Sequence, residues 1–201
     1  MIWNDGMKII MRRVALALVL SSIAVAALAE PVPLPSVDYM ATGNMGSRGM
    51  LTVRHHEGKL RTDMLMAGLP ISALILVDLT TRKALIHMPQ PGWQGAMEVD
   101  LGQAGGMGPV TGEGTKAGTS TVAGETCDVW QMTSRQSGNP LAACITADGI
   151  HLLTQVTIDG APVTVMEMTA VTRAPQDPGV FELPPGVPII RPPGPPPMPG
   201  R

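Results

Sequence analysis

The sequence predicts a mainly β protein, folded as a curved antiparallel meander with few or no covering helices. Strand-like segments recur at short spacing with turn residues between them, which is typical of antiparallel sheets. The chain of 201 residues contains 23 Gly and 20 Pro, a composition that disfavours a helical bundle. It has three Trp, one Tyr and one Phe against 44% hydrophobic residues, so the core must consist of aliphatic side chains and Met.

The first 29 residues are expected to be a signal peptide. Lys8, Arg12 and Arg13 precede the apolar run 14–27, and Ala27-Leu28-Ala29 offers a cleavage site before Glu30. The run is too short to span a bilayer comfortably, so no transmembrane anchor is expected after cleavage. We therefore expect an exported, periplasmic protein. Its formal charge of −2 shows no basic excess, which argues against nucleic-acid binding.

A hairpin with its loop at residues 56–58 is predicted from segments 50–55 and 59–64. Alternation places one set of side chains on an apolar face: Leu51, Val53, Leu60, Thr62 and Met64. The other face carries charged side chains and is expected to be solvated: Arg54, Lys59, Arg61 and Asp63. Residues 73–77 and 84–88 follow as strands, the first fully buried. Six glycines make residues 103–118 a predicted mobile loop.

Two dipeptides, Asp148-Gly149 and Asp159-Gly160, predict two-residue type I′ hairpins. Centring the first turn pairs Ile145 with Leu152 and Leu141 with Val156, all on one apolar face. A preceding loop centred at residues 135–136 adds Trp130 to this face, opposite Leu141. The same register places Cys127 opposite Cys144 on the other face.

Two cysteines in an exported chain predict one disulfide, Cys127–Cys144. A metal or redox pair is the alternative, but the chain has no C-x-x-C spacing. Residues 184–201 hold nine prolines and are expected to form a disordered tail, or else a proline-rich docking peptide. The predicted organisation is a signal peptide (1–29), a single β domain (30–183) and this tail.

Motifs for chemistry are absent from the sequence, which contains no G-x-S-x-G, no H-E-x-x-H and no free catalytic cysteine. We therefore expect no enzyme, no catalytic or metal residues and no cofactor. Soft Cu(I) ligands are conceivable at Met64-x-Met66, Met166-x-Met168 and His87-Met88. In a chain so poor in aromatics, however, methionine is expected to fill the core or line a cavity.

Segments 119–127, 143–150 and 181–186 resemble the exported bacterial proteins of domain of unknown function forty-four-twelve. Segments 59–64 and 77–79 fit the same pattern, and the resemblance spans about residues 37–186. Those proteins are similar in fold to the LolA and LolB lipoprotein carriers. The resemblance implies an unclosed barrel whose concave face is apolar and partly covered. A lipid or a lipoprotein acyl chain is then the implied partner.

Three functions remain open at this stage: a binding module for an apolar or amphiphilic molecule, a structural or interaction protein of the cell envelope, and a Cu(I) binder. The first is preferred, with a concave face lined by Leu51, Val53, Leu60, Met64, Trp130, Leu141, Ile145, Leu152 and Val156.

Overall fold

The computed structural model describes residues 28–69, 72–93, 95–101, 109–134 and 137–191. Most of the predicted signal peptide and the last ten residues lie outside these ranges. Within them the chain forms strands and two short 3₁₀ helices, η1 (Gly46–Arg48) and η2 (Pro178–Phe181). No helix in these ranges is long and apolar enough to cross a membrane. The strands are β1 (Glu30–Pro31), β2 (Tyr39–Asn44), β3 (Gly49–His56), β4 (Lys59–Met66), β5 (Ser72–Asp78), β6 (Lys83–His87), β7 (Ala96–Asp100), β8 (Glu113–Val122), β9 (Glu125–Thr133), β10 (Pro140–Ile145), β11 (His151–Ile158), β12 (Ala161–Thr172) and β13 (Ile189–Ile190).

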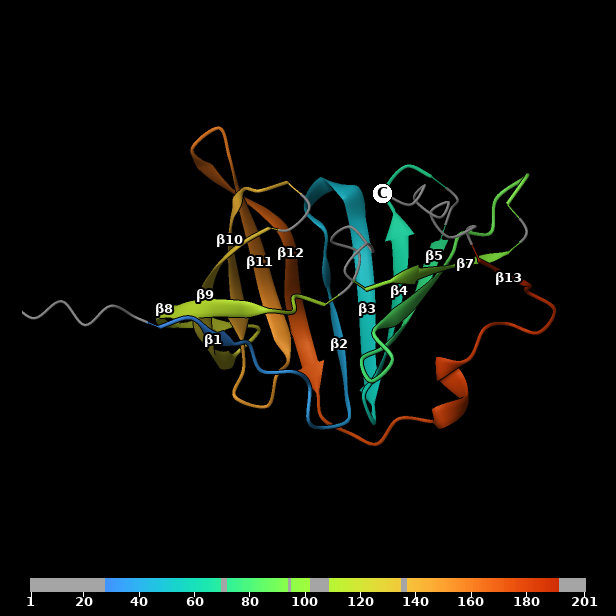
Figure 1. The fold of residues 1–201 in the computed structure, drawn as a ribbon, viewed down its shortest axis with the longest axis horizontal. Coiled ribbons are helices and arrows are strands. Elements are labelled where there is room, and N and C mark those ends of the chain that lie inside the picture. Colours follow the sequence, from blue (N-terminus) through green and yellow to red (C-terminus); the bar gives the residue numbers. More distant parts are fainter. Residues whose placement is uncertain (1–27, 70–71, 94, 102–108, 135–136, 192–201) are drawn as a thin grey trace, which may run out of the picture.

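All strands belong to one curved sheet, which confirms the predicted fold class (Figure 1). Its order is β1-β8-β9-β10-β11-β12-β2-β3-β4-β5-β6-β7-β13, so two meanders meet where β12 pairs with β2. Every pairing is antiparallel except that of β13 with β7. The sheet does not close into a barrel. Each of its two edges is a two-residue strand, which covers only residues 113–114 of β8 and residues 96–97 of β7.

Three two-residue hairpin loops have positive φ at both positions, as a type I′ turn requires: Glu57-Gly58, Ala123-Gly124 and Asp159-Gly160. The prediction at Asp159-Gly160 is thereby confirmed. The predicted two-residue turn at Asp148-Gly149 is wrong. There the Thr146 amide donates to the Ile150 carbonyl at 3.0 Å, and this closes a three-residue loop, 147–149.

Tertiary contacts explain the longer loop. The Asp148 carbonyl accepts a hydrogen bond from the Ser36 amide at 3.0 Å. A Cβ at Gly149 would lie 2.1 Å from the Leu34 carbonyl oxygen, and the φ of Gly149 is 83°. The extra loop residue shifts the β10–β11 pairing beside the loop by one residue. Ile145 therefore pairs with His151 rather than Leu152, and a bulge restores the predicted pairing at Leu141 and Val156.

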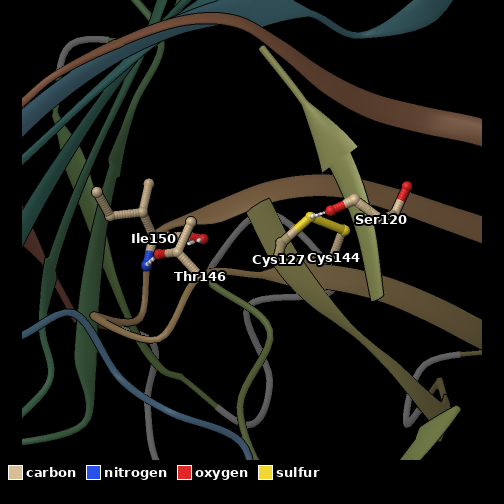
Figure 2. Close-up of a disulfide and its surroundings, with 5 residues drawn as sticks. All are labelled: Ser120, Cys127, Cys144, Thr146 and Ile150. Carbon is tan, nitrogen blue, oxygen red and sulfur yellow. Dashed lines mark hydrogen bonds between the residues drawn. A yellow bond between two sulfur atoms is a disulfide. The ribbon is translucent and has the colours of Figure 1, made fainter. Parts of the chain in front are cut away.

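The β9–β10 register also differs from prediction, by two residues. Trp130 pairs with Ala143 and Val129 with Cys144, so the two cysteines are not directly opposite each other. Because side chains alternate with a period of two, a two-residue shift leaves every side chain on its predicted face. Cys127 and Cys144 consequently still meet, with a Cα–Cα distance of 5.4 Å, and form the predicted disulfide between β9 and β10 (Figure 2).

The glycine-rich segment is only partly a loop. Residues 102–108 lie outside the described ranges, but β8 begins at Glu113 and thus includes residues 113–118, for which the sequence predicts a mobile loop. A Cβ at Gly114 would lie 2.8 Å from Met132 Cγ and 3.5 Å from Trp130 Cε3. Glycine is used here for close approach to large side chains rather than for flexibility.

Residues 184–191 also differ from the predicted disordered tail. After β12 the chain runs to η2 and then returns to the sheet as β13, which pairs with β7 (Figure 1). Phe181 is buried and stacks on His56 with ring centroids 6.0 Å apart, and Arg61 Nη1 donates to the Val180 carbonyl at 2.8 Å. This C-terminal segment covers part of the charged face that was expected to be solvated. The packed region therefore extends to Ile190.

Candidate functional site

A cavity of about 420 Å³ lies on the apolar face of the sheet. This volume is within the usual range of small-molecule sites. Side chains of six strands line it, from β10 through β12 and β2 to β4. In a flat sheet β4 and β10 would stand five spacings apart, about 24 Å. Both border one cavity because the sheet curves around it, so this face is the concave one.

Seven of the nine predicted lining residues border the cavity. From the N-terminal hairpin these are Leu51, Val53, Leu60 and Met64, and from the β10–β11 hairpin Leu141, Ile145 and Val156. The two hairpins are distant in sequence and form opposite walls. The sequence pattern identified both walls because each has a simple alternation of apolar residues.

Trp130 and Leu152 do not line the cavity. Trp130 is on the expected face but is only 2% exposed, because Val32 of the N-terminal segment packs over it and over Ile145. Leu152 is completely buried in the main core and has no partner on β10, since the bulge pairs the preceding His151 with Ile145. His151 lines the cavity in its place.

Several lining residues were not predicted. Pro33 and Pro35 belong to the N-terminal segment, which crosses the concave side before entering β2 (Figure 1). Nothing in their local sequence signals this position. Met166 and Met168 line the cavity from β12, where methionine is expected to fill the core or line a cavity, although neither is among the predicted lining residues. Arg48 borders the cavity from η1.

One end of the cavity, here called the closed end, is bordered by buried side chains. It lies where β10 ends and β2 and β11 begin, and Tyr39, Ile145 and His151 border it. His151 Nε2 is 2.9 Å from Thr154 Oγ1, and burial lowers the pKa of His151 to about 4. Burial also raises the pKa of the Tyr39 hydroxyl. Both side chains are therefore neutral at pH 7, and this end of the cavity carries no charge.

Ion pairs hold the chain around the closed end. Arg173 bridges Asp148, at 2.7 Å, and Glu125, at 2.8 Å. Hydrogen bonding to Arg173 lowers the pKa of the Asp148 carboxyl, more than burial raises it. Since the Asp148 carbonyl also binds the N-terminal segment through Ser36, these contacts fasten β12, the 147–149 loop and the cavity cover together.

The other end is open and more polar. It lies where β2 and β11 end and β3 begins, and its lining includes Arg48, Ser134, Ser137 and Asn139. Arg48 and Ser137 are exposed. Large apolar side chains are also exposed at this end of the sheet: Met50, Leu65, Ile158 and Val163.

The histidines other than His151 have structural partners. His55 Nδ1 lies 2.7 Å from the Val37 carbonyl and its Nε2 accepts from the Gly58 amide at 3.1 Å, so Nδ1 carries the proton. His56 contacts Asp38 at 2.8 Å, and His87 contacts the Gly95 carbonyl at 3.0 Å. In the described part of the chain, no group of three or more His, Cys, Asp or Glu is placed to hold a metal ion.

Comparison with known proteins supplies a fold but no function. No protein-family model matches the chain, and no curated protein matches it. Among solved structures, an uncharacterized conserved protein from Thermus thermophilus is similar, with a TM-score of 0.56. The match covers 78% of this chain and 91% of that protein at 12% sequence identity. At this identity the likeness shows a shared fold alone.

Proposed function

We propose that this protein is an exported periplasmic binding protein, not an enzyme, that holds an apolar or amphiphilic, lipid-like ligand in the concave cavity. The observation that carries the proposal is the cavity itself, which has apolar walls from two separate hairpins and one open end. Methionines in the lining suit such a ligand, because their flexible side chains adapt to varied acyl shapes.

The energetics of burial fit a moderate affinity. A dodecyl chain has eleven methylenes, and burying them contributes about 9 kcal/mol at about 0.8 kcal/mol each. Association costs at least about 4 kcal/mol in lost translational and rotational freedom. The difference of about 5 kcal/mol corresponds to a dissociation constant in the submillimolar range for the chain alone. At this lower bound of the association cost, burial of the chain alone gives reversible binding.

Export is proposed on the basis of the N-terminal sequence pattern. The disulfide is compatible with an oxidising compartment. Cleavage after Ala29 would leave all thirteen strands intact, since β1 begins at Glu30. N-terminal sequencing of the exported protein should begin at Glu30, and an uncleaved N-terminus would contradict this part of the proposal.

Binding can be tested with the neutral apolar dye Nile red. The parent protein should show saturable dye fluorescence, and Val156→Trp should reduce the affinity because the larger side chain fills the cavity. Thr157→Trp is the matched control. Thr157 follows Val156 on β11, its side chain lies on the opposite face, and it is not part of the cavity lining.

The dye result decides between classes of function. No saturable binding by the folded parent would overturn the carrier proposal and leave a structural or interaction role. Equal loss in both Trp variants would show that the dye binds elsewhere or that the substitutions unfold the sheet. Circular dichroism of each variant separates these two explanations.

A soft-metal site is the second candidate, because four methionines line the same cavity: Met45, Met64, Met166 and Met168. Thioether sulfur is a ligand for Cu(I). Organic-solvent extraction of the purified protein distinguishes the two candidates. A lipid in the organic phase supports the carrier, and stoichiometric copper in the aqueous phase supports the metal site.

A further inference from the structure

Hydrogen bonds position Arg48 at the open end of the cavity. Its amide donates to the Met45 carbonyl at 3.2 Å, and its own carbonyl accepts from the Ala67 amide at 2.8 Å. The following residue, Gly49, has a φ of 137°, and a Cβ there would lie 1.9 Å from the Leu65 carbonyl oxygen. Only glycine fits at position 49, where the backbone that follows Arg48 lies against the Leu65 carbonyl of β4.

The guanidinium of Arg48 has unused binding capacity. Nη2 donates to the Val165 carbonyl at 3.0 Å and Nε to the Met45 carbonyl at 3.4 Å. Among the described residues, no carboxylate lies within 4.0 Å of Arg48, and Nη1 has no hydrogen-bond partner. Four other arginines each have a carboxylate partner within that distance: Arg54, Arg61, Arg173 and Arg191.

Arg48 is also the only fully charged side chain among the described residues that line the cavity, which include no Asp, Glu or Lys. Toward the closed end, the lining is aliphatic or neutral. Along β11 the lining extends from His151 to Ile158, a distance of seven residue steps, or about 24 Å. A long apolar cavity with one cation at its mouth is complementary to a molecule with a long tail and one anionic group.

We propose that the ligand is a single-chain amphiphile with an anionic headgroup, a carboxylate or a phosphate, which Arg48 binds at the mouth while the acyl chain extends toward Tyr39 and His151. This inference rests on the proposed function and specifies its ligand class. Both anions match the planar guanidinium, whose free N–H groups can donate to two oxygens at once.

The test uses four ligands with twelve carbon atoms and different headgroups: dodecanoate, dodecyl phosphate, dodecanol and dodecylamine. Each displaces Nile red from the full mature protein below its micellar concentration. Dodecanoate should bind about tenfold more tightly than dodecanol, since an exposed hydrogen bond to a charged group lies at the low end of its usual strength. Added salt should reduce this difference.

Arg48→Gln should remove the preference for the anion and leave dodecanol binding unchanged, while Arg48→Glu should transfer the preference to dodecylamine. Arg82→Gln is the control, because it removes the same charge from an exposed arginine that does not line the cavity. Arg82→Gln should keep the parent's preference for dodecanoate over dodecanol.

Each outcome has a separate meaning. If dodecanol and dodecanoate bind the parent equally, or if Arg82→Gln weakens dodecanoate as much as Arg48→Gln does, the headgroup inference is wrong and the carrier proposal stands. If the folded parent binds none of the four, both are wrong. Where the inference holds, tighter binding of dodecyl phosphate than of dodecanoate indicates a phospholipid source, and the reverse order indicates a fatty acid.

Discussion

Acidification from pH 7 to pH 5 should destabilise the folded protein through His151. In the folded state burial lowers the pKa of this side chain to about 4, whereas an exposed histidine has a pKa near 6.5. The unfolded chain therefore takes up the proton first as the pH falls. Stability is lost progressively below pH 6.5, and the loss levels off near pH 4.

The size of this effect follows from the two pKa values. At pH 5, His151 is almost fully protonated in the unfolded chain and almost fully neutral in the folded protein. This difference lowers the free energy of unfolding by about 2 kcal/mol. The complete shift of about 2.5 units corresponds to about 3.4 kcal/mol below pH 4. Two kilocalories is a large fraction of the stability of a typical domain.

The assay is urea unfolding, followed by the fluorescence of the buried Trp130, at pH 7 and at pH 5. Carboxylates with lowered pKa values, such as Asp38 and Asp78, also destabilise the fold on acidification, so the parent must be compared with a variant. His151→Gln retains a polar partner for Thr154 and does not titrate. Between pH 7 and pH 5 the free energy of unfolding should fall by about 2 kcal/mol more for the parent than for this variant. Equal losses would refute the assignment of a neutral His151.

Two further predictions concern stability. The Cys127–Cys144 bridge joins residues 17 positions apart, and its reduction should lower the free energy of unfolding by about 3 kcal/mol. Urea titration of the oxidised and reduced protein measures this difference. Unchanged unfolding midpoints would show that the bridge does not constrain the chain. Gly49→Ala should lower the stability of the fold by more than about 2 kcal/mol, because the added Cβ would contact the Leu65 carbonyl. Gly68 is also at positive φ but has open space around it, so Gly68→Ala should lower the stability by only about 1 kcal/mol. Equal shifts in the melting temperatures of the two variants would contradict this reasoning.

The sequence by itself determined which side chains share a face. Alternation in β3, β4 and β10 depends on local backbone geometry, so Leu51, Leu60 and Leu141 could be placed on the concave face without knowledge of any distant contact. This assignment tolerates an even error in register. The β9–β10 pairing was displaced by two residues, yet Cys127 and Cys144 still form the predicted disulfide.

A register error of an odd number of residues, in contrast, moves side chains to the opposite face of the sheet. The third residue in the 147–149 loop moved His151 into the position expected for Leu152, and this loop is held by Ser36 and Arg173, which are remote in sequence. The local Asp-Gly signal was the same as at residues 159–160, where the prediction was correct. Tertiary contacts therefore selected between two turns that the dipeptide alone allows.

Only the tertiary structure decided what covers each face and where the cavity opens. Val32 removes Trp130 from the lining, and Phe181 covers charged strands that were predicted to be solvated. Arg48 has no local pattern to distinguish it from other arginines, and its position at the mouth depends on the pairing of β3 with β4 and on the Val165 carbonyl of β12. Periodicity records the orientation of a side chain relative to its own strand, whereas coverage depends on segments far away in the chain, whose packing leaves no periodic trace in the sequence.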